Sequence, residues 1–195
     1  MAISIMDMFS IGIGPSSSHT VGPMRAALRF IIAFQRTLEL SNIAHIQVEL
    51  FGSLGHTGKG HGSDKALILG LMGEQPEDVD PDTVEQKLIT IQTSGNLLIA
   101  GIQSIKFNSD KDIIFQRRKS LPKHPNGMRF SAYDCHQNLL FSKIYYSVGG
   151  GFIVNDDIND DSPFIADNRK LPYPFTTADQ LMAQCKTHGL SISAL

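Results

Sequence analysis

Cysteine is scarce in this sequence. The 195 residues include two cysteines, Cys135 and Cys185, which lie far apart along the chain. Zinc and iron–sulfur sites need three or four ligands that converge closely, so this pair is not a metal-ligand pattern. Two cysteines in a chain of this size are typical of buried, reduced thiols. We therefore expect no metal site within this chain.

Long runs of positive charge and long apolar runs are also missing. The net charge is −2, from 17 Lys and Arg against 19 Asp and Glu, and the longest basic run is residues 117–119. No basic face stands out, which disfavours nucleic acid as a partner. No segment approaches the roughly 20 apolar residues needed to cross a bilayer. The first apolar run reaches Asp7 too soon for a signal peptide, so we expect no membrane partner and a cytoplasmic location.

What is present suits a folded domain with a sizeable core. Hydrophobic residues make up 42% of the chain and charged residues 18%. Apolar residues at helical spacing predict a helix over about 20–40, with Pro23 in its first turn, where a missing N–H costs nothing. Further helices are expected over 64–72, 83–93 and 178–186, with a linker at 75–82. Five glycines between residues 52 and 64 predict a stretch without regular structure.

The rest of the chain predicts strands. His45 to Phe51 alternates, with Ile46, Val48 and Leu50 on one side, which is typical of a half-buried strand. Further strands are expected over 105–107, 113–116, 128–133, 139–148 and 152–154, with turns at 108–110, 126–127 and 136–138 and a polar loop over 155–169. Helices followed by strands predict an α+β fold with helices packed on a mainly antiparallel sheet. We expect one domain covering residues 1–195.

Three consecutive serines precede the first predicted helix. Ser16, Ser17 and Ser18 are followed by His19 and Thr20, after a loop of Gly and Pro. Free N–H groups and the positive dipole end of a helix N-terminus bind anions, and the hydroxyls add donors at the same place. This segment therefore suits a carboxylate or a phosphate. The alternative is a helix cap in an ordinary loop, because serine is a favoured capping residue.

His61 follows Thr57-Gly58-Lys59-Gly60 in the glycine-rich stretch. The segment loosely resembles a phosphate-binding P-loop, but its glycine spacing is wrong, and we reject nucleotide binding. A histidine between glycines can approach a ligand closely, and its imidazole suits acid–base work near neutral pH. The alternative is an isolated surface histidine on a loop.

Two further segments place polar groups on turns. His124 lies between prolines in residues 122–125, and Asn126-Gly127 predicts a tight turn directly after it. Gly149, Gly150 and Gly151 end a predicted strand, where successive N–H groups can form an anion-binding nest. The alternative for the three glycines is a β-bulge.

Taken together and in this order, these segments resemble one family, the iron–sulfur-dependent bacterial L-serine dehydratases. The resemblance runs over the whole chain. The matching segments are Asp7-Met8-Phe9, Gly12-Ile13-Gly14-Pro15-Ser16-Ser17-Ser18-His19-Thr20-Val21-Gly22-Pro23-Met24, Gly52-Ser53-Leu54, Thr57-Gly58-Lys59-Gly60-His61, His124-Pro125-Asn126-Gly127-Met128, Tyr145-Tyr146-Ser147-Val148-Gly149-Gly150-Gly151-Phe152 and Pro172-Tyr173-Pro174-Phe175.

The resemblance implies an enzyme of amino-acid catabolism that converts L-serine to pyruvate and ammonia. It implies that this chain is the N-terminal β domain, similar to the anion-binding regulatory domain of phosphoglycerate dehydrogenases. A [4Fe–4S] cluster is then held by a C-terminal helical domain of the same polypeptide, absent from this chain, and the enzyme is a homodimer. Family members often have a His-Thr pair after the residue matching His61. Here Gly62 and Ser63 follow it, so Ser63 is expected to supply that hydroxyl.

The residue roles follow from the resemblance and from the segments above. His61 is the expected general base, with His19 as the alternative. His19 is otherwise expected to bind the substrate carboxylate with Ser16, Ser17 and Ser18. Ser63, His124, Asn126, Ser147 and Gly149–Gly151 are expected to complete the pocket. Lys59 could act as base only if burial removed its charge. A competing function is a regulatory module that binds a small carboxylate without acid–base chemistry.

Overall fold

The computed structural model describes residues 12–155, 172–175 and 177–195. Contacts along the chain divide it into two compact units, residues 3–163 and residues 164–195 with the first two residues, and each is described by itself. The expected polar loop at 155–169 lies almost entirely outside the described residues. The prediction of one domain over 1–195 stays a prediction.

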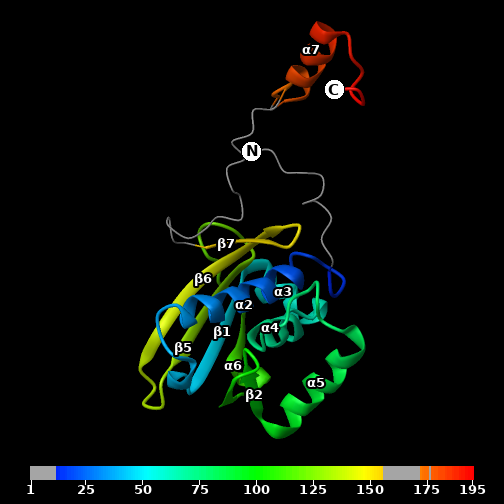
Figure 1. The fold of residues 1–195 in the computed structure, drawn as a ribbon. Coiled ribbons are helices and arrows are strands. Elements are labelled where there is room, and N and C mark those ends of the chain that lie inside the picture. The colour runs from blue at the N-terminus through cyan, green and yellow to red at the C-terminus, as the bar shows by residue number, and fades with distance from the viewer. Residues whose placement is uncertain (1–11, 156–171, 176) are drawn as a thin grey trace. The chain divides into compact units, whose positions relative to one another are not determined.

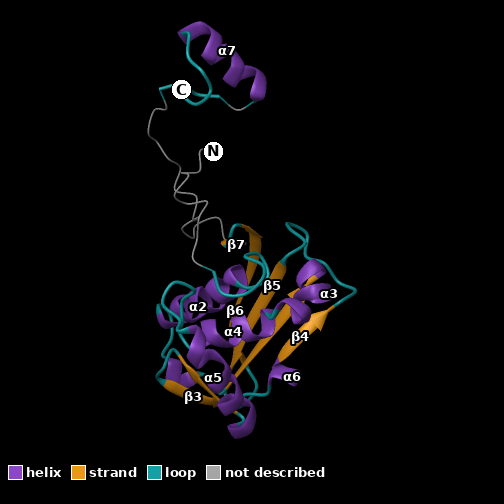
Figure 2. Cartoon of the chain, turned by 90° about the vertical axis from the view of Figure 1, so that its right-hand side faces the viewer, coloured by secondary structure: helices purple, strands orange, loops and turns teal. Residues whose placement is uncertain are grey.

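The larger unit is built on a five-stranded sheet with strand order β4-β1-β5-β6-β7 (Figures 1 and 2). Strand β1 pairs in parallel with β4, and the other three pairings are antiparallel. This confirms the predicted α+β class with a mainly antiparallel sheet. The five strands are β1 (His45–Phe51), β4 (Ile113–Gln116), β5 (Gly127–Tyr133), β6 (Leu139–Gly149) and β7 (Phe152–Asn155).

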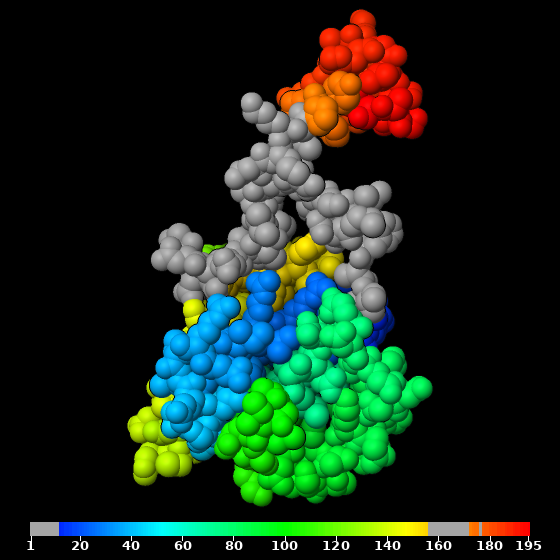
Figure 3. All heavy atoms as spheres, in the orientation of Figure 1, coloured from blue at the N-terminus to red at the C-terminus, as the bar shows by residue number. Residues whose placement is uncertain are grey.

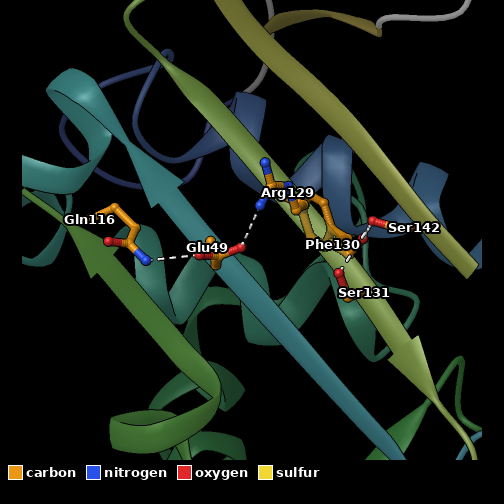
Figure 4. A network of polar contacts seen from close by, with 6 residues as sticks. All are labelled: Glu49, Gln116, Arg129, Phe130, Ser131 and Ser142. Atoms are coloured by element: carbon orange, nitrogen blue, oxygen red, sulfur yellow. Dashed lines mark hydrogen bonds and ion pairs between the residues drawn. The ribbon is translucent and has the colours of Figure 1, made fainter. Parts of the chain in front are cut away.

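Alternation along β1 explains its two faces. Ile46, Val48 and Leu50 are fully buried, as their spacing predicts for one side of a strand. Glu49 points to the other side, where its carboxylate accepts from Gln116 Nε2 on β4 at 2.8 Å and from Arg129 Nη1 on β5 at 3.1 Å (Figure 4). One side chain thus bridges the parallel and the antiparallel pairing of the central strand.

Helices gather on one side of this sheet (Figure 2). Helix α2 (Val21–Gln35) buries Met24, Phe30 and Phe34, and Phe30 stacks on Phe130 of β5 with ring centroids 5.3 Å apart. Helix α4 (Ser63–Leu71) packs against α2. In the space-filling view the blue atoms of the N-terminal part lie directly beside the turquoise and green atoms of the middle part of the chain (Figure 3). The remaining elements are η1 (Leu40–Asn42), α5 (Pro81–Ser94), β2 (Asn96–Ile99), β3 (Gln103–Lys106) and α6 (Ser109–Asp112).

The glycine-rich stretch is helical, and the prediction of an irregular stretch there was wrong. Residues 52–61 form helix α3, which Gly62 ends in the left-handed conformation with φ of 77°. A Cβ on Gly55 would lie 2.8 Å from the Gln116 carbonyl oxygen and 2.9 Å from that of Leu50. The glycine is therefore explained by close packing of the helix on β1 and β4, which outweighs its low helix propensity.

Three further local predictions were wrong. The first helix ends at Gln35 rather than near residue 40, where a short 3₁₀ turn begins instead. Strand β2 was missed, although it pairs with β3 as a separate two-stranded sheet. Gly127 begins strand β5, and neither it nor Asn126 has a positive φ, so these two residues do not form the expected tight turn.

The smaller unit contains helix α7 (Ala178–His188). Thr177 caps it by accepting from the Gln180 N–H at 3.3 Å, and Gly189 ends it in the left-handed conformation. Both cysteines are free, but only Cys185 is buried, and Cys135 is exposed, which corrects the expectation of two buried thiols. None of the helices in the described ranges is long and apolar enough to cross a membrane.

Candidate functional site

Two histidines from distant parts of the sequence lie side by side in the larger unit. The rings of His19 and His61 have centroids 4.9 Å apart and are tilted by 46°. His19 belongs to the serine-rich turn before α2, and His61 is the last residue of α3. The sequence motifs that contain them are therefore parts of one site.

The hydrogen bonds of His19 determine which ring nitrogen carries its proton. Thr57 Oγ1 donates to the Ser53 carbonyl at 2.9 Å, so it can only accept from His19 Nε2, which lies 3.0 Å away. Ser53 Oγ lies 3.3 Å from the same nitrogen. In neutral His19 the other nitrogen, Nδ1, is then an acceptor, and Ser18 Oγ lies 3.0 Å from it. Hydroxyl groups thus hold both sides of this buried ring.

Replacing Thr57 with valine is expected to weaken the preference of His19 for the Nε2–H tautomer, because the nearer acceptor for that proton is removed at a cost of about 1 kcal/mol and only Ser53 Oγ at 3.3 Å is left. Imidazole ¹⁵N chemical shifts near neutral pH measure the tautomer directly. Thr57→Ser keeps the hydroxyl and is the matched control. An unchanged His19 spectrum in Thr57→Val would contradict the assignment.

Burial lowers the pKa of His19 below its ordinary value, and the neighbouring His61 lowers it further, while a hydrogen bond involving the Ser53 backbone raises it. The unfolded chain then binds more protons than the folded one just below the ordinary histidine pKa of about 6.5, so stability increases with pH in that range. The stabilisation is complete above the ordinary value and is lost as pH falls through the lowered pKa of His19.

We expect the free energy of unfolding to decrease between about pH 7 and about pH 5, and to decrease less in His19→Gln. Urea unfolding at several pH values measures both slopes. His136→Gln, in the exposed turn between β5 and β6, is the control and should keep the wild-type slope. Equal slopes for wild type and His19→Gln would contradict the shift.

His61 is held at the end of α3 by its own helix. Its Nδ1 lies 2.9 Å from the Thr57 carbonyl, which can only accept, so Nδ1 carries a proton. In neutral His61 the lone pair is then on Nε2, to which no described residue is bonded. The ring is partly exposed. His61 therefore does not lie in the irregular stretch that was predicted, because the helix that ends at Gly62 fixes its position.

The serine-rich turn is tightly bonded to itself. The N–H groups of His19 and Thr20 donate to the Ser16 carbonyl at 3.1 and 2.8 Å, and that of Gly22 donates to Ser17 at 2.9 Å. These three N–H groups are not available to an anion. The Ser18 hydroxyl donates its one proton to Nδ1 of neutral His19, so an anion at this turn would be bound mainly by the hydroxyls of Ser16 and Ser17, and the predicted anion site depends on the side chains.

Ser63 anchors the turn from α4. Its hydroxyl is fully buried and donates to the His19 carbonyl at 2.6 Å. Ser63, which was expected to supply the hydroxyl of the family's His-Thr pair, therefore lies next to the site. Its hydroxyl is used to hold His19 in place.

Asn126 and Ser147 form a second buried polar group. The Ser147 N–H donates to the Asn126 carbonyl at 3.0 Å, and Asn126 Nδ2 donates back to Ser147 at 3.2 Å. Within the described part of the chain, Asn126 Oδ1 and Ser147 Oγ are buried without a hydrogen-bond partner. A Cβ on Gly22 would lie 2.8 Å from Ser147 Cβ, so this pair packs against the start of α2.

The loop before Asn126 joins the same region. Ser53 N–H donates to the Pro125 carbonyl at 2.9 Å, which connects this loop to the start of α3. The N–H of Asn126 donates to His124 Nδ1 at 3.1 Å, which orients that ring. The structure therefore brings the loop of His124 and Asn126 to the two helices that carry His19 and His61.

Gly149, Gly150 and Gly151 connect β6 to β7 with three successive positive φ angles of 103°, 57° and 79°. The sheet register shifts between Ser147 and Gly149, in agreement with the bulge considered as the alternative to a nest. Arg25 Nη1 of α2 donates to the Gly151 carbonyl at 3.1 Å. The glycines thus lie beside α2, and their role as an anion nest stays a prediction.

Two functional candidates escaped the sequence analysis, Ser53 and Thr57. With His61 they recur every four residues and lie on one face of α3. This spacing was visible in the sequence, but the glycines between them led us to expect no helix.

The residues of this chain do not fit a [4Fe–4S] cluster. Such a cluster is held by four cysteine thiolates, or by three with one open position, and the whole sequence contains two cysteines. Cys135 follows strand β5 in the larger unit, and Cys185 lies on α7 in the smaller one. Any cluster would therefore have to be bound elsewhere.

Comparison with known proteins decides the family. The family model described as serine dehydratase beta chain matches residues 4–158, a span that includes His19, His61, Asn126 and Ser147. The chain belongs to this family. The resemblance inferred from the motifs is thereby confirmed.

Several curated proteins match this chain along its whole length. An L-serine dehydratase of Streptomyces coelicolor is 49% identical over 195 residues, and L-serine dehydratase 1 of Escherichia coli is 41% identical over 195. One from Helicobacter pylori is 37% identical over 194 residues. These matches cover 99–100% of this chain but only 42–43% of each relative. The chain thus spans about two fifths of the length of the curated relatives it matches.

Proposed function

We propose that this chain is the substrate-binding and acid–base domain of an L-serine dehydratase. The observation that carries the proposal is the convergence of four motif segments around the His19–His61 pair. The relatives are named for this activity. Because they are more than twice as long as this chain, the rest of the active site is proposed to lie in a C-terminal domain of the same polypeptide. That domain would hold the [4Fe–4S] cluster, and the full enzyme is proposed to be a cytoplasmic homodimer.

The proposed division of labour follows the hydrogen bonds. The hydroxyls of Ser16 and Ser17 bind the substrate carboxylate, and the bond between Ser18 and His19 holds this turn in place. The lone pair on Nε2 of neutral His61 accepts the α-proton, and the Thr57 carbonyl orients the ring by accepting a hydrogen bond from Nδ1–H. The remaining candidates are proposed to form the wall of the pocket around these groups; they are Ser63, His124, Asn126, Ser147 and Gly149–Gly151.

The reaction that these groups serve removes water and then ammonia. His61 takes the α-proton and the Cβ–O bond breaks. The leaving hydroxide takes up one proton in return to become water, and aminoacrylate results. Aminoacrylate tautomerises to an imine, which reacts with water to give pyruvate and ammonia. We propose that activation of the leaving hydroxyl falls to the part of the polypeptide outside this chain.

A chimera tests the proposal. Residues 1–195 replace the matched segment of the Streptomyces coelicolor relative, which is 49% identical. We expect this chimera to form pyruvate from L-serine at a rate within about tenfold of the parent enzyme. A correctly folded chimera that binds neither L-serine nor its product would contradict the proposed function.

By itself, the 195-residue chain is expected to be colourless and to form no pyruvate from L-serine, because its two cysteines cannot hold a cluster. Anaerobic purification followed by an absorbance spectrum and a pyruvate assay measures both properties. A brown protein, or turnover of L-serine, would contradict the placement of the cluster outside this chain.

A further inference from the structure

A second pocket of about 440 Å³ lies in the larger unit and shares no residue with the His19–His61 site. Residues from the end of α3, from α4, from α5 and from the segment between β3 and β4 line it. Pockets of a few hundred Å³ are the usual size for small-molecule sites. The pocket is therefore large enough for a ligand of amino-acid size.

Its floor is apolar. Ile68, Ile91 and Phe107 are among the lining residues and are 6%, 7% and 3% exposed, and Leu88 is half-buried beside them. These four side chains come from three separate elements. These side chains keep only a small exposed area, so the favourable term for a ligand with a large apolar side chain is mainly the removal of its own apolar surface from water.

Its rim carries both signs of charge. Lys59 and Lys65 supply two ammonium groups, and Asp64 and Asp110 supply two carboxylates. Lys59 Nζ and Asp110 Oδ1 are 3.7 Å apart, with side chains 65% and 80% exposed. Such an exposed pair contributes little by itself, so both groups can exchange their contact for a ligand at small cost.

We propose that this pocket binds the zwitterion of an α-amino acid with a large apolar side chain. The lysines receive the carboxylate, the aspartates receive the ammonium group, and the apolar side chain covers the floor. A simple anion would be attracted by the two lysines but repelled by the two aspartates. A simple cation would be attracted by the aspartates but repelled by the lysines. The balanced rim therefore selects a molecule that carries both charges.

The pocket is placed to affect the proposed active site. Lys59 lies on α3 between Thr57 and His61, and Asp64 and Lys65 directly follow Ser63, which bonds to His19. Gly62 joins the two helices at the left-handed corner. A ligand that contacts both Lys59 and Lys65 would change the angle between α3 and α4 at Gly62, and thereby the position of His61.

Methyl NMR on the 195-residue chain tests the proposal with L-phenylalanine, whose ring shifts nearby methyl resonances. We expect saturable shifts of the methyl groups of Ile68, Leu88 and Ile91, with a dissociation constant on the order of 1 mM, as expected for a ligand of this size. 3-Phenylpropanoate lacks the ammonium group and 2-phenylethylamine lacks the carboxylate. Each is expected to bind about tenfold more weakly or worse, and glycine is expected to shift none of these methyl groups.

Variants locate the charges. Lys65→Gln and Asp110→Asn are each expected to weaken L-phenylalanine binding about tenfold, while Lys106→Gln, on β3 outside the pocket, leaves it unchanged. Absence of methyl shifts up to the solubility limit of L-phenylalanine would overturn the proposal. So would equal affinity for 3-phenylpropanoate, which would indicate an anion site. The readout does not involve catalysis, so it is independent of the proposed function.

Discussion

Replacing His61 with alanine is expected to lower kcat for L-serine by about 10²–10⁴, while KM stays within about an order of magnitude. The reason is geometric. Nδ1 of His61 is committed to the Thr57 carbonyl at 2.9 Å, so in neutral His61 only Nε2 can take a proton, and the ring is partly exposed. Its loss removes proton transfer in the transition state but leaves carboxylate binding intact. Steady-state kinetics on the chimera or on a full-length polypeptide measures both constants.

Two further variants separate this role from others. His19→Ala is expected to raise KM more than it lowers kcat, because His19 holds the serine-rich turn through Ser18. His56→Ala is the matched control, since His56 is an exposed histidine on the same helix and should behave as wild type. A nearly normal kcat for His61→Ala, with the absorbance of the complete enzyme unchanged, would move the base to His19 or outside this chain.

Gly70→Ala is expected to destabilise the larger unit by about 3 kcal/mol, at the upper end of the usual cost of overpacking. A Cβ on Gly70 would overlap the Met24 carbonyl oxygen of α2 and would lie 2.8 Å from Ala27 Cβ. Because the obstacle is backbone, α2 and α4 would have to move apart. Thermal unfolding is then expected to shift by roughly 6–12 °C, at about 2–4 °C per kcal/mol for this chain length.

Gly60→Ala is the matched control on the neighbouring helix. A Cβ there would meet nothing within 4 Å, and Gly60 lies inside α3. Alanine is expected to stabilise by about 0.5–1 kcal/mol, because it reduces the freedom of the unfolded chain and favours the helix. If Gly70→Ala were neutral or stabilising, the close contact between α2 and α4 would be contradicted.

Much of the fold could be predicted because its signals are local. The alternation of Ile46, Val48 and Leu50 predicts β1 with its observed bounds, and strands 113–116, 128–133 and 139–148 were predicted to within a residue of their observed ends. The predictions failed where long-range packing outweighs local preference. Glycine has low helix propensity, yet Gly55 lies in α3, because only a residue without a side chain lets that helix approach β1 and β4 so closely at this position.

The amino-acid sequence alone determined the α+β class, the family resemblance and the chemical types of the candidate residues, because periodicity and motif order are written in consecutive residues. Only the tertiary structure decided that His19 and His61 are neighbours and that Thr57 bonds to both, through its hydroxyl and its carbonyl. It also decided that Ser63 holds the His19 carbonyl rather than facing outward. The pairs Thr57–His19, His61–His19 and Ser63–His19 join residues 38–44 positions apart, whereas the contact of Thr57 with His61 is local to α3. They arise from the packing of α2, α3 and α4 on the sheet, and no local pattern encodes that packing.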